Sequence, residues 1–348
     1  MSVTALTQDD LLELLRERRP ARLQDLYARA DAVRQEHVGD AVHLRGLIEI
    51  SSHCARQCMY CGLRQGNRAL TRYRMPREEI LDCAREAERL GYGTVVMQAG
   101  EDDQLTAEWI AEIVRWIKRE TALAVTLSLG ERQHDEFQLW RSAGADRYLL
   151  RFETSDEDLF RVIHPQRSPG GPSRLTLLRQ LKSLGYEAGG GVMVGIPGQS
   201  YESLANDILT FHSLDLDMIG IGPFIPDPRT PLADERNAYA DDPEMHFVAL
   251  AVLRLANPDA HIPATTAYDA LFPTPSGRDM ALQRGANVFM PNSTPGQYRR
   301  DYMLYPDKPC VDESGGMCAF CVVGRLEMLG RHVAGGPGNT VKRHLAAE

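Results

Sequence analysis

Apolar positions along the chain repeat with two different periods. Two helical patterns open the sequence, one through DDLLELLRER after Thr7 and one over residues 21–37. From residue 42 onward, short apolar runs alternate with stretches whose apolar positions recur every three or four residues. This alternation predicts βαβ units, in which helices connect parallel strands.

Eight of the apolar runs are predicted to be strands. They cover residues 42–50, 94–99, 123–129, 147–152, 189–195, 217–224, 262–265 and 286–290. Helices are predicted between them, over residues 76–91, 107–119, 134–143, 173–184, 201–212, 243–255 and 277–284. Eight parallel βα units close most economically into a barrel. We therefore predict an α/β fold, a TIM-type (βα)8 barrel over residues 41–300, with an N-terminal helical extension (1–40) and a C-terminal capping segment (301–348).

Charge and composition narrow the class of protein. The 348 residues carry a formal net charge of −9, which disfavours nucleic acid or an anionic membrane as the main partner. No apolar run approaches the roughly 20 residues that span a bilayer. The N-terminal segment is acidic and amphipathic, unlike a signal peptide. We expect a cytoplasmic protein that acts on a small molecule.

The cysteines predict metal binding rather than disulfides. Their odd number and their grouping fit a disulfide framework poorly; they are Cys54, Cys58, Cys61, Cys83, Cys310, Cys318 and Cys321. Cys83 falls on the apolar face of a predicted helix, so we expect it in the core.

The first three cysteines form a C-x3-C-x2-C motif directly after the first predicted strand. Cys54, Cys58 and Cys61 could each bind one iron of a cubane, which leaves the fourth iron open to a chelating ligand. A structural zinc ion would want four ligands, and His53 is badly placed to be the fourth because it immediately precedes Cys54. The spacing favours a [4Fe–4S] cluster, with zinc as the alternative.

Polar residues follow several predicted strands, at the barrel face where active sites lie. They are Glu101, Ser128, Arg151, Glu153, Thr265 and Thr266. Arg151 and Glu153 occupy alternate positions of one strand and should both point inward. Because an unpaired buried charge is costly, we expect the two to pair with each other or with a charged ligand.

The C-x3-C-x-aromatic-C motif resembles the signature of the radical S-adenosylmethionine (SAM) superfamily. The resemblance implies that SAM chelates the open iron and is cleaved reductively to methionine and a 5′-deoxyadenosyl radical. Gln98–Asp102 is similar to the family's Gly-Gly-Glu segment, with Ala99 as a departure, and Gly189–Gln199 is similar to its glycine motif. The SAM-binding residues that the resemblance implies are Tyr60, Gly100, Glu101, Ser128, Arg151, Glu153 and Arg174.

Longer segments resemble a narrower group, the HydE maturases of [FeFe]-hydrogenase. The likeness runs from about residue 40 to 330 and includes CGLRQGNRALTRYRM (61–75), GIGPFIPDPRTPLA (220–233) and GANVFMPN (285–292). It implies an organometallic iron substrate carrying cysteine, CO and cyanide, a ferredoxin- or flavodoxin-type electron donor, and other hydrogenase maturases as partners. Positions matching the family's cavity are Thr265, Thr266, Met218, Met290, Tyr302 and Tyr305. For the two methionines, a role in the barrel core is the stronger interpretation.

The late cysteines Cys310, Cys318 and Cys321 are similar to an accessory [2Fe–2S] cluster found in some of these maturases. Zinc, with Asp312 or water as a further ligand, is the alternative there. A radical SAM amino-acid mutase similar to methylornithine synthase is the second interpretation of the whole chain. A third, from another class, is a non-enzymatic zinc or iron–sulfur protein. Biotin synthase would carry a second cluster inside the barrel with its own cysteine ligand. It is disfavoured because no cysteine lies between Cys83 and Cys310.

Overall fold

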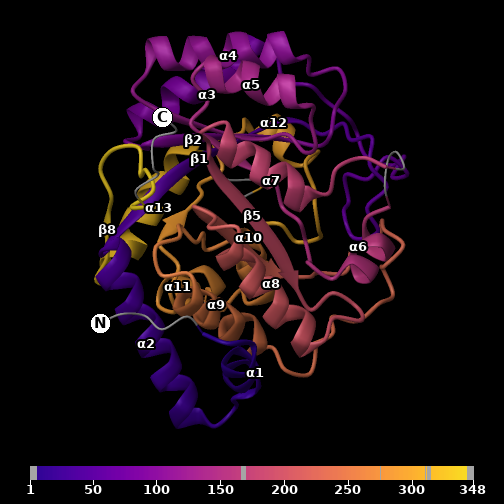
Figure 1. Ribbon diagram of the computed structural model, residues 1–348. Coiled ribbons are helices and arrows are strands. Elements are labelled where there is room, and N and C mark those ends of the chain that lie inside the picture. Colours follow the sequence, from indigo (N-terminus) through magenta and orange to yellow (C-terminus); the bar gives the residue numbers. More distant parts are fainter. Residues whose placement is uncertain (1–5, 166–169, 275, 310, 312–314, 343–348) are drawn as a thin grey trace.

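A ring of parallel strands forms the centre of the molecule (Figure 1). The computed structural model describes residues 6–165, 170–274, 276–309, 311 and 315–342. The strands lie in the order β6-β5-β4-β3-β2-β1-β7, and β8 pairs with β1. Their bounds are β1 Ala41–Ser51, β2 Thr94–Ala99, β3 Ala124–Ser128, β4 Arg147–Leu149, β5 Glu187–Val194, β6 Met218–Pro223, β7 Val288–Phe289 and β8 His332–Val333.

An extended segment, residues 261–264, closes the ring between β6 and β7. The Ile219 amide donates to the His261 carbonyl at 2.9 Å, and the Ala264 amide donates to the Val288 carbonyl at 2.9 Å. This segment lies where the sequence predicts the seventh strand. The (βα)8 prediction is therefore confirmed, with the seventh strand reduced to isolated bridges.

Helices cover the outside of the ring (Figure 1). The helices that follow strands β1 to β6 are α3 Arg77–Arg89, α4 Ala107–Glu120, α5 His134–Ser142, α6 Glu157–Ile163, α7 Arg174–Ser183, α8 Tyr201–Ser213 and α9 Met245–Ala256. Shorter helices complete the C-terminal third, namely α10 Thr266–Leu271, α11 Gly277–Leu282 and α12 Gly296–Arg299. Within the described residues, no helix is long and apolar enough to span a membrane.

The N-terminal helices pack against the barrel helices rather than on the strands. α1 (Gln8–Arg16) contacts α8 and α9, and α2 (Pro20–Val38) contacts α9. Thr7 caps α1 as predicted, in a capping box with Asp10. Leu11 and Leu15 of α1 are fully buried in the main core.

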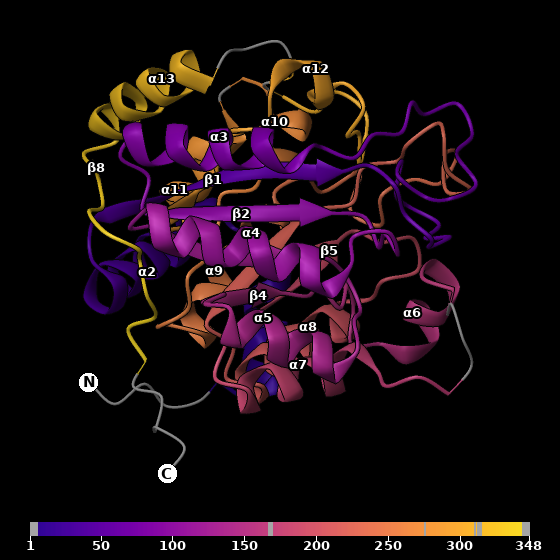
Figure 2. The same ribbon diagram turned by 90° about the horizontal axis from the view of Figure 1, so that it is seen from above.

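The C-terminal segment crosses the end of the barrel where the strands begin (Figure 2). It contains α13 (Gly315–Met328) and β8, followed by residues 335–342, which we call the strap. Arg147 donates to the carbonyls of Pro337 and Gly338 at 3.0 Å each, and Thr94 donates to the Pro337 carbonyl at 2.8 Å. The strap thus covers the face of the barrel opposite the cysteine loop.

Candidate active site

The cysteine loop leaves the C-terminal end of β1 and lies over the mouth of the barrel. Backbone hydrogen bonds hold it from three directions. The Ala55 amide donates to the Glu101 carbonyl at 2.8 Å, the Met59 amide to Ile163 at 2.8 Å, and the Gly62 amide to Leu304 at 2.9 Å. The loop is therefore fixed by the segment after β2, by the last residue of α6 and by the segment before α13, which are far apart in the sequence.

Burial raises the pKa of all three thiols of this loop. Desolvation raises the pKa of Cys58 to about 12. It also raises the pKa of Cys54 and Cys61, and for Cys61 the neighbouring thiols Cys58 and Cys54 raise it further. A bound metal supplies the positive charge that displaces such protons.

The donor set of the loop is three thiols, which fits an iron–sulfur cluster. In the described part of the chain, no three His, Cys, Asp or Glu side chains are arranged to hold one metal ion. Three thiols that each bind a different iron need not converge on one point. Gly100 lets the backbone after β2 lie against the loop, since a Cβ there would be 2.3 Å from the His53 carbonyl oxygen and 2.6 Å from Cys54 Cβ.

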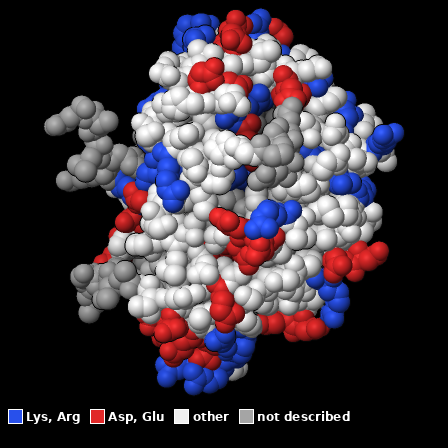
Figure 3. All heavy atoms as spheres, turned by 45° about the vertical axis from the view of Figure 1, so that its right-hand side comes forward, with Lys and Arg blue, Asp and Glu red and all other residues white. Residues whose placement is uncertain are grey.

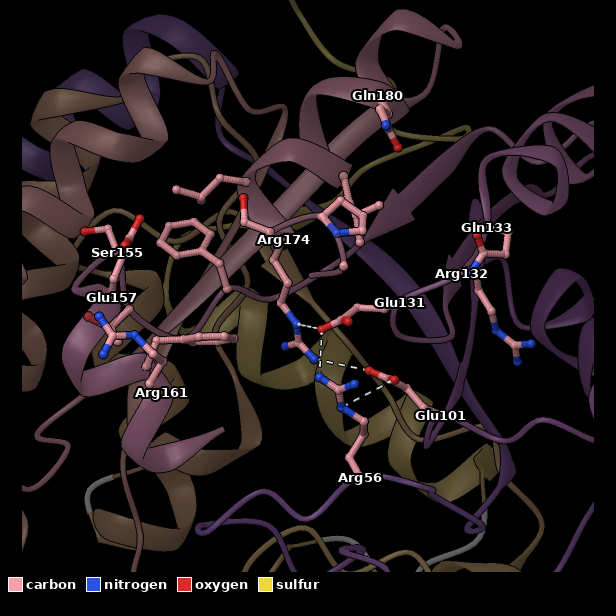
Figure 4. Close-up of a pocket in the computed structure, with 18 of the residues that line it drawn as sticks. Arg56, Glu101, Glu131, Arg132, Gln133, Ser155, Glu157, Arg161, Arg174 and Gln180 are labelled. Atoms are coloured by element: carbon pink, nitrogen blue, oxygen red, sulfur yellow. Dashed lines mark hydrogen bonds and ion pairs between the residues drawn. The ribbon is translucent and has the colours of Figure 1, made fainter. Parts of the chain in front are cut away.

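A network of two arginines and two glutamates lies beside the cysteine loop (Figure 4). Arg174, at the start of α7, donates to Glu131 at 2.7 Å and to Glu101 at 3.2 Å. Arg56, inside the cysteine loop, donates to Glu131 at 3.0 Å. Desolvation raises the pKa of Glu101, while Arg174 and Arg56 act against that shift.

This network forms one wall of a cavity of about 680 Å³. The other walls come from the starts of α5 and α7 and from α6, with Phe152, Phe160 and Leu175 among the apolar lining residues. Glu101 and Arg174 were predicted from the sequence, whereas Arg56, Glu131 and the helix α6 were not. Arg56 had a local signal, because it lies between two of the cysteines.

His164, at the end of α6, contacts both arginines of the network. Its two ring nitrogens lie 2.7 Å from Arg174 Nη2 and 3.2 Å from Arg56 Nη2. Burial and the two guanidinium groups lower the pKa of His164 to about 2, so the imidazole is neutral. The sequence offered no motif that would have identified this residue.

Arg151 and Glu153 form the ion pair that the sequence predicted, at 3.0 Å. They lie beyond β4, which ends at Leu149 rather than at residue 152. The extended backbone continues, since Phe152 donates to the Gly191 carbonyl at 3.0 Å, but Glu153 has a positive φ of 63°. Leu149 pairs with Gly189 and Glu153 forms an isolated bridge with Val192, so the β4 side has one extra residue between these pairs, and this irregularity ends the regular ladder at Leu149.

Polar side chains also meet near Tyr302 and Tyr305, which precede α13. Thr266 and Tyr305 share a hydrogen bond of 2.5 Å, and Gln98 donates to the Tyr302 hydroxyl at 3.2 Å. The Thr265 hydroxyl is buried and lacks a partner among the described residues. An orphaned hydroxyl of this kind is free to bond a ligand.

Comparison with known proteins identifies the family. Residues 48–210 match the model of the radical SAM superfamily. The chain is 47% identical to the [FeFe] hydrogenase maturase subunit HydE of Thermotoga maritima, over 88% of this chain and 86% of that protein. The chain belongs to the radical SAM superfamily.

Other known proteins share the fold. The chain is 30% identical to the 3-methylornithine synthase of Methanosarcina acetivorans, over 81% of this chain and 78% of that protein. The crystal structure of methylornithine synthase (PylB) superposes with a TM-score of 0.81 at 27% identity, covering 95% of each chain. The maturase HydG aligns with a TM-score of 0.70 at 18% identity, over 82% of this chain and 65% of that one, which shows the fold alone.

Membership makes this chain a radical SAM enzyme and implies a [4Fe–4S] cluster and SAM as its cofactors. Tyr60, the aromatic residue of the motif, packs beside Ile163, Met193 and Ile196. Ser128 ends β3, paired in register with Gln98. These two residues lie at strand ends or on the cysteine loop, where the superfamily resemblance would have them contact SAM.

The structure places the two methionines that were predicted for the cavity at opposite ends of the barrel. Met290 directly follows β7, at the mouth side, whereas Met218 begins β6 at the opposite end of the barrel. There the Met218 sulfur accepts a hydrogen bond from Arg45 at 2.8 Å, among buried core residues. Of the late cysteines, Cys310 and the side chain of Cys318 lie outside the described residues. Cys321 is exposed on α13.

Proposed function

We propose that this radical SAM enzyme is a HydE-type maturase that acts in the assembly of the [FeFe]-hydrogenase active site. The observation that carries the proposal is the 47% identity to the Thermotoga maritima HydE over most of both chains. We propose an organometallic iron–cysteine complex as its substrate and a ferredoxin- or flavodoxin-type protein as its electron donor. Other hydrogenase maturases are the proposed partners.

With the cluster and SAM bound, the cofactors supply reductive cleavage of SAM to methionine and a 5′-deoxyadenosyl radical. We assign Cys54, Cys58 and Cys61 to the cluster. Two ion pairs, Glu101–Arg174 and Arg151–Glu153, suit the zwitterionic amino-acid part of SAM because each offers both signs of charge. Tyr60, Gly100 and Ser128 complete the proposed SAM site. These residues bind and orient the cofactor; the electron comes from outside the chain.

The protein's own contribution on the substrate side is positioning. The orphaned Thr265 hydroxyl and the Thr266–Tyr305 pair are proposed to hold polar groups of the substrate, with Tyr302 and Met290 beside them. Met218 was predicted for this cavity, but its position at the far end of the barrel supports a role in the core. Cys310, Cys318 and Cys321 are proposed as ligands of an accessory [2Fe–2S] cluster.

An in vitro maturation assay tests the proposal. Unmatured [FeFe]-hydrogenase is combined with the other maturases and with either wild-type protein or Cys58→Ser, and hydrogen evolution is measured. We expect hydrogen evolution with the wild type and none above background with the variant. A variant lacking all three late cysteines should retain most of the wild-type effect. Hydrogen evolution that does not depend on the wild-type protein would contradict the proposal.

The second candidate is an amino-acid mutase similar to methylornithine synthase. It is favoured by the TM-score of 0.81 to that enzyme, with 95% of each chain covered. Formation of 3-methylornithine by the reconstituted wild type, in the absence of a maturation effect, would establish this function instead.

A further inference from the structure

Arg72 lies beside the cysteine loop on a backbone that is fixed independently of any cofactor. Residues 72–75 run antiparallel to the end of β1. The Ser52 amide donates to the Tyr73 carbonyl at 3.1 Å, and the Met75 amide donates to the Ile50 carbonyl at 2.9 Å. A bridge between Ser51 and Arg74 joins the same segments. The position of Arg72 is therefore set by the barrel.

The Arg72 guanidinium donates hydrogen bonds to four backbone carbonyls. Nη1 donates to Ser52 at 2.5 Å and to Leu63 at 2.8 Å. Nη2 donates to Arg64 at 2.8 Å and to Asn67 at 3.2 Å. Ser52 precedes the first cysteine of the loop and the other three acceptors follow the last one. One side chain thus ties together the two ends of the loop that holds Cys54, Cys58 and Cys61.

Arg72 differs from the neighbouring arginines in that no carboxylate pairs with its charge. Arg56 and Arg74 form ion pairs with Glu131 and Asp102. Arg229 pairs with Asp227. Arg72 has no carboxylate at ion-pair distance among the described residues, and its four acceptors are neutral.

Two further observations support a fixed cation at this point. Arg64 also lacks an ion pair within the described chain, but it is held by one hydrogen bond, to the Cys58 carbonyl at 3.2 Å. Burial lowers the pKa of Arg72, while the nearby thiols of Cys54 and Cys61 act to raise it. An arginine pKa stays far above neutrality in proteins, so Arg72 remains a cation.

We propose that Arg72 is a positioning residue for the cluster, which clamps both ends of the cysteine loop and places an uncompensated positive charge beside Cys54 and Cys61. The inference rests on the proposed assignment of the cluster to these cysteines. A cluster becomes more negative by one charge when it is reduced. A fixed cation stabilises that state more than the oxidised one and raises the reduction potential. Arg72 therefore makes the cluster easier to reduce.

The test is an EPR-monitored redox titration of the anaerobically reconstituted, full-length holoprotein. Arg72→Gln removes the charge, Arg72→Lys keeps the charge but loses the forked clamp, and Arg68→Gln is the matched control. Arg68 is exposed in the same loop and makes no hydrogen bond or ion pair with any described residue. We expect a more negative midpoint potential for Arg72→Gln. Arg72→Lys and Arg68→Gln should remain close to the wild type.

Equal midpoint potentials for Arg72→Gln and wild type would overturn the inference. If Arg72→Gln loses its cluster while Arg72→Lys keeps it, the iron retained per chain becomes the readout. That result would show that the positive charge at this position is needed to hold the cluster. Loss of the cluster in both folded variants would overturn the role of the charge. A wild-type protein that takes up no cluster would instead refute the proposed function, so the two failures are distinguishable.

Discussion

At the scale of single residues, the charged groups of the site form ion pairs because an unpaired buried charge is costly. Glu101 and Arg174 meet at 3.2 Å, and Arg151 and Glu153 at 3.0 Å, at the end of the barrel that carries the cysteine loop. The sequence predicted the second pair because two opposite charges on alternate positions of an inward face imply each other. It could not predict Arg56, Glu131 and His164 as partners, since their segments meet only in the folded chain.

Asp207 of α8 is a buried carboxyl with no cation beside it among the described residues. Its Oδ1 accepts hydrogen bonds from the Ser155 amide and hydroxyl at 2.5 and 2.7 Å and from the Thr154 hydroxyl at 3.2 Å. These residues follow Glu153 directly, so Asp207 anchors the segment that carries the ion pair. Desolvation raises the pKa of Asp207 to about 7.

This raised pKa predicts a pH dependence of stability. Between about pH 4 and pH 7 the folded state binds a proton at Asp207 that the unfolded state has lost, so the free energy of unfolding falls as pH rises. Asp207→Asn keeps the oxygen that accepts these bonds and cannot ionise. The stability of this variant relative to wild type should therefore increase between pH 5 and pH 8, measured by urea unfolding. A difference between the two proteins that does not change with pH would contradict the prediction.

At the scale of elements, the predicted strands and long helices are largely present because they carry strong apolar periods. β2 covers residues 94–99 as predicted, and α4 covers Ala107–Glu120. The sequence missed α6, α10, α12 and α13. The first three are seven residues or shorter, too short for a periodic pattern, and they depend on packing against the barrel. β4 was predicted too long because its pairing with β5 becomes irregular after Leu149, where one extra residue precedes the bridge from Glu153 to Val192, and no apolar pattern marks such an irregularity.

The contact between the end of β2 and the cysteine loop can be tested at Gly100. A methyl group there would collide with the His53 carbonyl and Cys54 Cβ, so Gly100→Ala should push the loop away from its position. We expect iron uptake per chain to fall severalfold while the circular dichroism spectrum is retained. Gly296→Ala is the matched control, because a Cβ at that position meets nothing within 4 Å. Normal iron uptake by Gly100→Ala would refute this account of the contact.

At the scale of the whole molecule, the two ends of the barrel differ: one carries the candidate active site and the other is closed by the C-terminal segment. One end carries the cysteine loop, the arginine–glutamate network and the cavity. The other end is covered by the strap (residues 335–342), with Arg147 fully buried beneath it. On the face shown in Figure 3, acidic and basic side chains are interspersed without an extended basic area. The barrel and its active end were predictable from strand count and cysteine spacing, but the strap has no apolar period and was predicted only as a cap.

Removal of the strap should destabilise the fold. Arg147 would lose its bonds to Pro337, Gly338 and Asn339, and Lys342 would lose its bond to Asp215. Since several hydrogen bonds to the strap and the burial that it provides are lost together, we expect truncation after Ala334 to cost on the order of 3 kcal/mol or more. Urea unfolding measures this loss. Truncation after Lys342 keeps every strap contact and serves as the control, and equal stability of the two truncated proteins would contradict the prediction.

The most direct test of the central claim is the production of 5′-deoxyadenosine. The protein is reconstituted anaerobically with iron and sulfide, reduced with dithionite and supplied with SAM, and the product is quantified. Cys58→Ser removes a proposed cluster ligand, and Cys83→Ser changes an equally buried cysteine in the core of α3. We predict 5′-deoxyadenosine from wild type and Cys83→Ser and none above background from Cys58→Ser. Its absence from wild-type protein with a loaded cluster, or its undiminished formation by Cys58→Ser, would contradict the account.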